Sequence, residues 1–207
     1  YANLDGWSPS AKAMGDKKPK LSVLDEWILT RLNQTVGVST EALDRFDAFS
    51  ASSEIEKFVD DLSLWYIRRS RGRVGPAADS ENDKNSFYHT TYYILHTTAK
   101  LLAPFTPFLA EVIYSNLTKE ESVHLADWPI VDLRSKIQDL KLISEMQKIR
   151  EIVEKAHAVR KEKQIPVRQP LNSFSTTQKP VSKNLEYLVK DEINVKKIVW
   201  NSKTDEF

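Results

Sequence analysis

The hydrophobic pattern of the chain is clearest between Ser50 and Arg73, where apolar side chains recur at steps of three and four residues. This spacing predicts an α-helix with one apolar face, because residues three and four apart lie on the same side of a helix. The positions on that face are Ile55, Phe58, Val59, Leu62, Trp65, Tyr66 and Arg69. The polar positions expected on the opposite side are Glu54, Lys57, Asp60 and Asp61. Ser53 and Glu56 have the spacing of a capping box, which indicates that the helix begins there.

Further helices are predicted on both sides of this stretch. Ser22 and Asp25 form a second capping-box pattern, which begins a helix that continues towards Phe46. Its apolar positions are Leu24, Trp27, Ile28, Leu32 and Val36. A third pattern predicts a helix over residues 87–102, and Thr106–Pro107 begin the next one, because proline is favoured in a first helical turn. In that last helix the positions expected to face inward are Phe108, Val112, Ile113 and Leu117.

The last third of the chain combines one long helix with a small α/β element. Asp132 is expected to cap a helix that runs to about Lys163. Its buried face is predicted to contain Leu133, Ile137, Leu140, Ile143, Met146, Ile149, Val153 and Ala156. After it, residues 172–177 and 194–200 are predicted to be strands and residues 182–190 a short helix. If the two strands pair, a crossover helix between them makes the pair parallel and the connection right-handed.

Composition narrows the class of protein. A hydrophobic content of 41%, with five Trp, seven Tyr and eight Phe, is sufficient for a buried core. The absence of cysteine excludes disulfides, cysteine zinc sites and thiol catalysis. No apolar run approaches about 18 residues, so no membrane span is predicted. The net charge is only +1, which means that any attraction to nucleic acid must come from a local basic surface.

Two basic clusters stand out against this nearly neutral background. The first ends the central helix and consists of Arg68, Arg69, Arg71 and Arg73, with no acid between them. The second consists of Arg160, Lys161, Lys163 and Arg168. A cation at a helix C-terminus contributes roughly 0.3–1 kcal/mol through the helix dipole, and one arginine is enough for that. Four arginines within six positions indicate a polyanion nearby, and a solvated helix end is the alternative interpretation.

No set of catalytic or metal-ligating residues is recognisable in the sequence. His89 and His96 are seven positions apart, whereas a metal pair on a helix needs a spacing of three or four. The adjacent carboxylates Asp60 and Asp61 point to different helix faces, which argues against a shared acid–base site. There is no glycine-rich phosphate loop and no Ser/His/Asp set. We therefore assign no catalytic residue and no metal ligand.

Several long motifs resemble those of one family. Residues 60–73, DDLSLWYIRRSRGR, resemble the signature helix of the anticodon-binding domain of class I isoleucyl-tRNA synthetases. Leu64 stands where the family usually has asparagine, and Val74–Gly75 stand where it has an aromatic pair. Six further stretches resemble family motifs in the family order: YANLDGW (1–7), LDEWILTRLN (24–33), LAPFTPFLAEVIYSNL (102–117), SVHLADWP (122–129), IPVRQPL (165–171) and DEINVKKIVW (191–200). The resemblance therefore covers nearly the whole chain.

The resemblance implies a mainly α fold, the anticodon-binding helical bundle of class I aminoacyl-tRNA synthetases, followed by a small α/β appendage. The expected parts are a segment leading in from a missing catalytic domain (1–21), the bundle (22–165) and a small α/β subdomain (166–207). The HIGH-like and KMSKS-like motifs of the family's catalytic domain do not occur in the sequence. We therefore expect a fragment that is inactive alone and binds no cofactor. ATP and Mg would be bound by the missing catalytic domain of the parent, an isoleucine-tRNA ligase.

The function implied by the resemblance is binding of the anticodon stem-loop of tRNA(Ile), within a cytoplasmic enzyme that attaches isoleucine to its tRNA for protein synthesis. Its partners would be that tRNA and the catalytic domain of the same parent chain, with no membrane. All eight residues of the two basic clusters are nominated as RNA-binding, because Lys and Arg neutralise phosphates without reading sequence. Two alternatives remain: the same domain of a valyl-, leucyl- or methionyl-tRNA synthetase, and a free-standing helical module that binds protein. SVHLADWP and IPVRQPL favour isoleucine.

Overall fold

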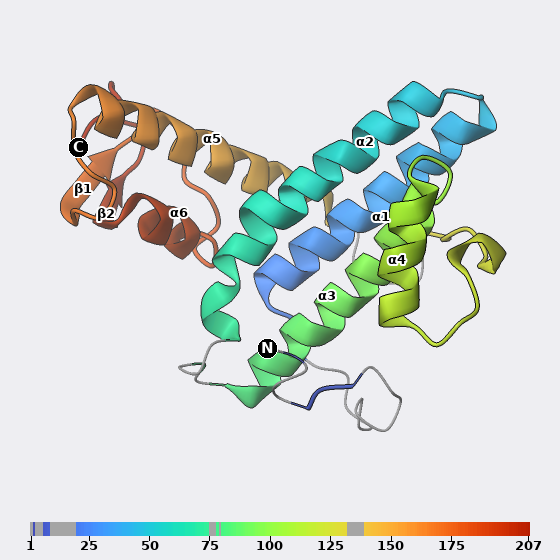
Figure 1. Ribbon diagram of the computed structural model, residues 1–207. Helices are drawn as coiled ribbons and strands as arrows, with labels where there is room; N and C mark the ends of the chain where they lie inside the picture. The colour runs from blue at the N-terminus through green and yellow to red at the C-terminus, as the bar shows by residue number, and fades with distance from the viewer. Residues whose placement is uncertain (1, 3–5, 9–19, 75–77, 79, 132–138) are drawn as a thin grey trace. The chain divides into compact units, whose positions relative to one another are not determined.

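The computed structural model describes residues 2, 6–8, 20–74, 78, 80–131 and 139–207 of the chain. The chain forms two compact units, one of residues 1–139 and one of residues 140–207. Helices dominate both units, and in the part of the chain that the structure describes the one sheet is a pair of parallel strands in the second unit (Figure 1). The predicted class, a mainly α protein with a small α/β part, is confirmed.

The first unit is built on a hairpin of two long helices. Helices α1 (Val23–Asp44) and α2 (Ala48–Asp60) lie side by side and are joined by a short turn (Figure 1). The capping box at the start of α1 is confirmed, because the Ser22 hydroxyl accepts the Asp25 N–H while the Asp25 carboxylate accepts the Ser22 N–H. The predicted apolar positions of α1 are all buried: Leu24, Trp27, Ile28, Leu32 and Val36.

The central helix differs from the prediction in two places. It begins at Ala48, where the Asp47 carboxylate accepts the Ser50 N–H at 3.0 Å, so the predicted start at Ser53 is wrong. Over η1 (Asp61–Ile67) the backbone changes from an α-helix to a π-helix. The i to i+5 hydrogen bonds of a π-helix place more residues in each turn and therefore shift the faces that follow. Asp61, the first residue of η1, is buried, and Val59, predicted on the apolar face, is 38% exposed.

An arginine of α1 accounts for the inward position of Asp61. The Nε of Arg31 donates to Asp61 Oδ2 at 2.9 Å, and its Nη2 donates to Glu54 Oε1 at 3.2 Å. Both carboxylates were predicted to face solvent, and the structure contradicts this. A charge is tolerated inside a protein when it is paired and hydrogen-bonded. Arg31, which lies in α1 30 positions before Asp61, provides both the opposite charge and the hydrogen bond.

Helices α3 (Glu81–Leu102) and α4 (Pro107–Leu117) complete the described part of the first unit, together with the short 3₁₀ turns η2 (Arg71–Arg73) and η3 (Val123–Leu125). Helix α3 begins six positions earlier than predicted. Its cap is Ser80, whose hydroxyl accepts the Asp83 N–H at 3.3 Å. The polar first turns of α3 carry no apolar residue, which is why the hydrophobic pattern did not reveal them.

Helix α4 begins at Pro107, as predicted, but it packs through a different face. Phe108 is 88% exposed and Val112 is 58% exposed, so the prediction that they face inward is wrong. Ala110 and Tyr114 are fully buried instead, in a cluster with Ala99 and Val123. The small side chains of Ala99 and Ala110 allow α3 and α4 to approach closely, and a pattern based on large apolar residues misses such a contact.

The second unit consists of α5 (Leu140–Glu162), β1 (Leu171–Ser175), α6 (Glu186–Ile193) and β2 (Val195–Val199). The strands are parallel, with Leu171 opposite Val195 and Phe174 opposite Ile198, which confirms the predicted strand–helix–strand element. Helix α6 packs against α5 and β2. The core combines residues of all four elements: Met146, Ile149, Ile152, Ala156, Phe174, Leu188, Val189, Ile193 and Ile198.

The boundary between the units differs from the predicted one. The chain divides between Asp139 and Leu140, whereas the sequence placed the division between residues 165 and 166. The difference arises because α5 packs against α6, and so belongs with the strands. Leu140, predicted in the buried face, is 69% exposed, and the predicted cap at Asp132 and the first apolar positions Leu133 and Ile137 lie outside the described residues.

Within the described residues, no helix is long and apolar enough to cross a membrane.

Candidate nucleic-acid interface

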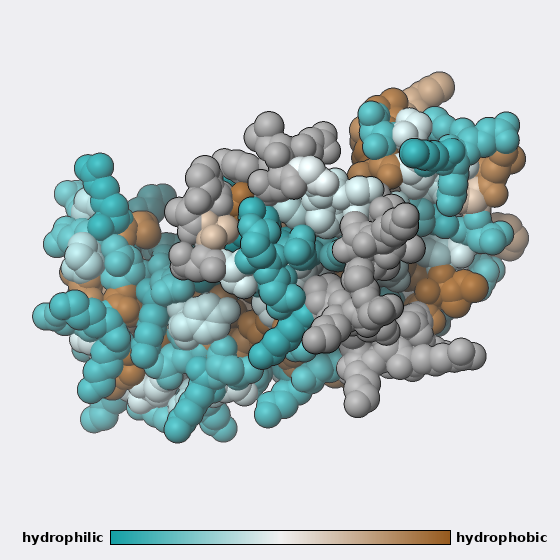
Figure 2. All heavy atoms as spheres, turned by 90° about the horizontal axis from the view of Figure 1, so that it is seen from below, coloured by the Kyte–Doolittle hydropathy of each residue, from teal (hydrophilic) through white to brown (hydrophobic). Residues whose placement is uncertain are grey.

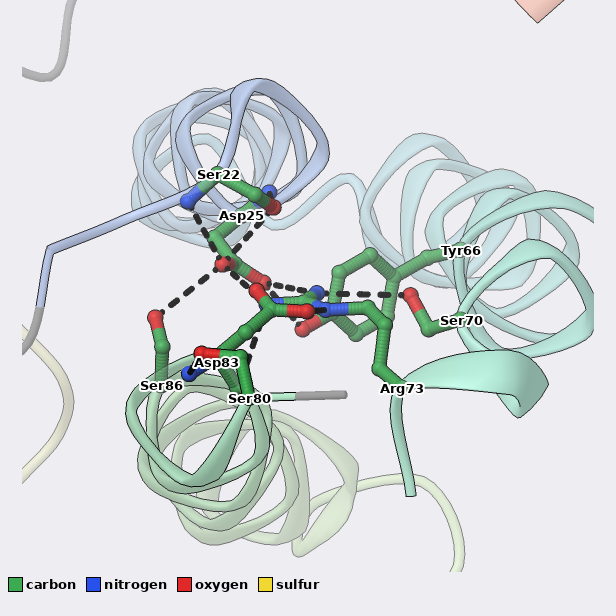
Figure 3. Close-up of polar contacts among 8 residues, drawn as sticks. All are labelled: Ser22, Asp25, Tyr66, Ser70, Arg73, Ser80, Asp83 and Ser86. Carbon is green, nitrogen blue, oxygen red and sulfur yellow. Dashed lines mark hydrogen bonds and ion pairs between the residues drawn. The ribbon is translucent and has the colours of Figure 1, made fainter. Parts of the chain in front are cut away.

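The first basic cluster ends with Arg73, which is turned into the first unit and binds two carboxylates (Figure 3). Its Nη1 and Nη2 donate to the two Asp25 oxygens at 2.8 and 2.7 Å. Its Nε and Nη2 donate to the Asp83 oxygens at 2.9 and 2.8 Å. The guanidinium group therefore makes two bidentate ion pairs, one with Asp25 of α1 and one with Asp83 of α3. Arg73 joins the ends of helices and is not directed towards an external ligand.

Asp25 is the centre of this network and is fully buried. Besides Arg73, it accepts hydrogen bonds from the Tyr66 hydroxyl at 2.6 Å, the Ser86 hydroxyl at 3.1 Å and the Ser22 N–H at 2.8 Å (Figure 3). These donors come from the start of α1, from η1 and from α3. The sequence predicted Asp25 only as part of a capping box. Its larger role, as the acceptor that ties three helices together, had no signal in the local pattern.

The electrostatics of the network favour a charged Asp25. Burial by itself raises the pKa of this carboxyl group, but the hydrogen bonds and the charge of Arg73, followed by the Tyr66 and Ser22 hydrogen bonds, lower it below its ordinary value overall. Burial and the neighbouring Asp25 charge raise the pKa of Tyr66. Although burial acts in the opposite direction, the hydrogen bonds to Asp25 and Asp83 raise the pKa of Arg73. The carboxylate, the phenol and the guanidinium group therefore keep complementary protonation states.

The other arginines of the first cluster have different surroundings. Arg68 and Arg69 both lie near one aromatic residue, with their guanidinium carbons 5.8 and 5.6 Å from the Trp65 ring centroid. Arg68 is exposed and donates its Nε to the Leu64 carbonyl at 2.9 Å, whereas Arg69 is half-buried. Arg71 is exposed in the turn η2. The structure thus separates Arg73 from Arg68 and Arg71, which are the two members of the cluster with exposed side chains.

The second cluster is divided in the same way. Arg160 has an exposed fraction of only 1%. Its Nη1 donates to the Pro166 carbonyl at 2.8 Å, and its Nη2 contacts the carbonyls of Ile193 at 2.7 Å, Gln169 at 3.2 Å and Asn194 at 3.4 Å. The Phe207 ring lies 4.7 Å from the guanidinium carbon. Burial lowers the pKa of Arg160.

Lys161, Lys163 and Arg168 are exposed around this buried arginine. Figure 2 shows mainly hydrophilic side chains on the visible face of the unit that contains α5 and α6. The sequence treated all eight cations alike, and the structure sorts them by burial. Arg73 and Arg160 bind protein groups, and Arg69 is half-buried. The exposed members are Arg68, Arg71, Lys161, Lys163 and Arg168.

The two histidines of α3 have aromatic neighbours. The His89 ring lies 5.1 Å from the Trp7 ring, and the His96 ring is stacked with the rings of Tyr92 and Tyr114 at 6.1 and 5.2 Å. Burial lowers the pKa of both histidines, and the nearby Lys100 lowers that of His96 further. Within the described ranges, no group of three or more His, Asp or Glu side chains is arranged to hold a metal ion.

A comparison with protein families decides what kind of domain this is. Residues 25–175 match the family model described as "Anticodon-binding domain of tRNA ligase". The chain belongs to this family. Both basic clusters lie inside the range that matches the anticodon-binding domain, and so does every residue of the Asp25 network except Ser22.

Individual relatives agree with this assignment. The chain is 38% identical to "Isoleucine--tRNA ligase" of Chlamydia pneumoniae, over an alignment that covers all of this chain and 20% of the relative. It is also 38% identical to the protein of that name from Dehalococcoides mccartyi, with 96% of this chain covered. The chain spans about a fifth of the length of the curated relatives it matches. The resemblance to the anticodon-binding domain of isoleucyl-tRNA synthetases is confirmed.

Proposed function

We propose that this chain binds the anticodon stem-loop of tRNA(Ile) as one part of an enzyme that attaches isoleucine to that tRNA with the use of ATP. The observation that carries the proposal is the similarity of the whole chain to isoleucine--tRNA ligases, together with the anticodon-binding family match over residues 25–175. The relatives support isoleucine over valine, leucine or methionine. They also argue against a free-standing module, because they contain the matching region within a much longer chain.

The exposed cations provide the mechanism. Arg68 and Arg71 in the first unit, and Lys161, Lys163 and Arg168 in the second, neutralise RNA phosphates and fix the position of the tRNA without reading its sequence. Bases of the single-stranded anticodon loop are then recognised by stacking and by hydrogen bonds to their edges. Arg73 and Arg160 contribute indirectly, since their guanidinium groups bind Asp25 and the Ile193 carbonyl and so fix the backbone from which the exposed cations project.

The rest of the enzyme supplies the chemistry in this proposal. ATP and Mg bind to the catalytic domain of the parent chain, and that domain and the tRNA are the partners of the present chain. The compartment that fits is the cytoplasm, without any membrane contact. The support is the name shared by the relatives, which describes a ligase of isoleucine and tRNA.

Replacing Arg68 and Arg71 together with glutamine tests the tRNA proposal. The double variant is expected to bind tRNA(Ile) more weakly, and the slope of log K against log salt should flatten by about 1.4, at about 0.7 for each lost contact to single-stranded phosphate. The measurement is a titration of labelled tRNA(Ile) with the 207-residue chain between about 50 and 200 mM salt, the range over which such contacts change affinity strongly.

The matched control removes two exposed lysines of the same unit, with the substitutions Lys57→Gln and Lys119→Gln. This variant loses the same charge, so an equal effect would mean general electrostatic attraction and would contradict a role for the arginine pair. If the Arg68 and Arg71 variant has an unchanged salt slope and only a lower melting temperature, these arginines stabilise the end of the helix and do not contact RNA. Absence of measurable wild-type binding would refute the proposed function itself.

The isolated chain is expected to have no ligase activity, because the HIGH-like and KMSKS-like motifs are absent from its sequence. The measurement is isoleucine-dependent exchange of pyrophosphate into ATP, with the purified 207-residue chain and a full-length isoleucine--tRNA ligase as the positive control. Exchange above background that depends on isoleucine would contradict this expectation.

A further inference from the structure

The basic charge of the chain is concentrated in its second unit. Residues 140–207 contain 14 Lys and Arg against nine Asp and Glu, a net charge of +5, although the whole chain carries only +1. The first 139 residues therefore carry a net charge of −4. A field of one sign attracts and orients a partner of the opposite sign, so the unit of α5, α6 and the two strands is the one whose overall charge suits a polyanion.

The geometry of the sheet collects several of these cations at one end. Because β1 and β2 are parallel and Leu171 lies opposite Val195, both strands begin at the same end of the sheet. The turn that precedes β1 and the residue that precedes β2 meet there. The Leu171 N–H donates to the Asn194 carbonyl at 3.1 Å, and the Asn194 side-chain amide donates to the Val167 carbonyl at 3.1 Å. Four exposed cations lie in or next to these segments and are called here the basic end: Lys163, Arg168, Lys196 and Lys197. Lys163 and Arg168 lie before β1, and Lys196 and Lys197 are the second and third residues of β2, so their side chains lie on opposite faces of the sheet.

The buried Arg160 holds the basic end together. Its two terminal nitrogens bind carbonyls on both sides of the junction, Pro166 and Gln169 in the turn and Ile193 and Asn194 before β2. The turn and the start of β2 are thereby fixed to one side chain, and the backbones that carry the cations cannot move independently. A surface that is ordered before binding loses less conformational entropy when a ligand arrives, which favours affinity.

Uncharged groups at the same end distinguish the kind of polyanion. Gln164, Gln169 and Asn172 are exposed there, and each amide offers both donors and acceptors to the edge of an unpaired base. The segments that form the basic end also contain or adjoin three acids, so its charge is not uniformly positive. These acids are Glu162, Asp191 and Glu192. Separate cations interspersed with amides suit an RNA strand, whose charged phosphates alternate with polar bases.

We propose that the basic end binds the RNA backbone, with Lys196 and Lys197 contacting phosphates in addition to Lys163 and Arg168. This extends the interface beyond the eight nominated residues and beyond residue 175, where the family match ends. The sequence carried a signal for it in the consecutive lysines of NVKKIVW, which were assigned only to a strand. The inference rests on the proposed tRNA binding and specifies where part of it takes place.

The test compares two double variants of the 207-residue chain. Lys196→Gln with Lys197→Gln removes two charges from the basic end, and the matched control, Lys179→Gln with Lys203→Gln, removes two from exposed positions that follow the opposite ends of the strands. We expect the first variant to bind labelled tRNA(Ile) about tenfold more weakly at 0.1 M salt and to flatten the log–log salt slope by about 1.4. The control should bind like the wild type, and both variants should keep the wild-type melting temperature.

Each other result counts against the basic end. An equal loss in both variants would indicate general attraction, and wild-type binding by the Lys196 and Lys197 variant would exclude these residues from the interface. If the latter result accompanies weakened binding by the Arg68 and Arg71 variant, the proposed function stands and only the basic end is refuted. Displacement of the tRNA by polyglutamate as efficiently as by unlabelled tRNA would identify an acidic protein as the preferred partner. Absence of wild-type tRNA binding would overturn both proposals.

Discussion

Replacing Asp25 with asparagine is expected to lower the free energy of unfolding of the first unit by about 3 kcal/mol. Removing one partner of a buried ion pair costs about 3–5 kcal/mol, because the other charge is left without compensation. Arg73 keeps its contacts with Asp83, which places the expected loss at the lower limit of that range. Tyr66 and Ser86 also lose the carboxylate to which they donate.

Intrinsic tryptophan fluorescence in a urea titration is a suitable measurement, since four of the five tryptophans belong to residues 1–139. The control is Asp60→Asn, an exposed carboxylate of the same unit, which should change the unfolding free energy by less than about 0.5 kcal/mol. Equal unfolding curves for the Asp25 and Asp60 variants would show that the buried network adds no stability.

The same carboxyl group makes stability depend on pH. The pKa of Asp25 is lower in the folded chain than its ordinary value of 3.8, so the folded state binds the proton less readily than the unfolded state does. Its contribution to stability is therefore complete above the unfolded pKa and is lost as the pH falls through the folded pKa. Acid titration of the wild type should show this loss below about pH 4, and the Asp25→Asn variant should show a correspondingly smaller acid dependence.

Replacing Arg160 with glutamine is expected to destabilise the second unit by about 3 kcal/mol. A buried carbonyl that loses its donor costs about 1–3 kcal/mol, and Arg160 serves the carbonyls of Pro166, Ile193 and Gln169, with Asn194 at a longer distance. The glutamine side chain is too short to reach both sides of the junction. Lys161→Gln, at the neighbouring exposed position, removes the same charge and should change stability by less than about 0.5 kcal/mol.

Hydrogen exchange at the Leu171 amide provides a local measurement, because that N–H donates to the Asn194 carbonyl within the junction. Protection of this amide should fall sharply in the Arg160 variant and stay unchanged in the Lys161 variant. If both variants keep full protection, Arg160 does not hold the junction.

The sequence predicted the elements of the fold well, since these depend on local chemistry. The apolar positions of α1, the start of α4 at Pro107 and the strand–helix–strand element are all found where spacing and turn residues indicated them. The two errors at the starts of helices have different causes. Ser80 caps α3 seven residues before its first large apolar side chain, Phe87. Asp47 caps α2 two residues before Phe49, which is 80% exposed and so does not belong to the buried face.

The charged residues could not be predicted in the same way. Arg73 is 48 positions from Asp25, and Arg160 is 33 positions from the Ile193 carbonyl, so their burial depends on partners that no local pattern contains. Without a known partner, a charged residue is expected at the surface, and this rule placed Asp61, Arg73 and Arg160 incorrectly. The sequence therefore located the candidate interface as two basic stretches. Which of their cations are exposed and which bind protein groups follows only from the three-dimensional arrangement.

The π-helix between Asp61 and Ile67 determines the direction in which the first basic cluster points. Each residue of an α-helix turns the chain by about 100°, so one residue more or fewer before Arg68 would rotate every arginine that follows by that angle. With the wider turns of η1, Asp61 faces Arg31, Tyr66 reaches Asp25, and Arg68 remains exposed. A single-residue deletion within η1 would leave all four arginines in the sequence and yet redirect them. The orientation of this interface is thus encoded in the hydrogen-bond register of a helix as well as in the identity of its side chains.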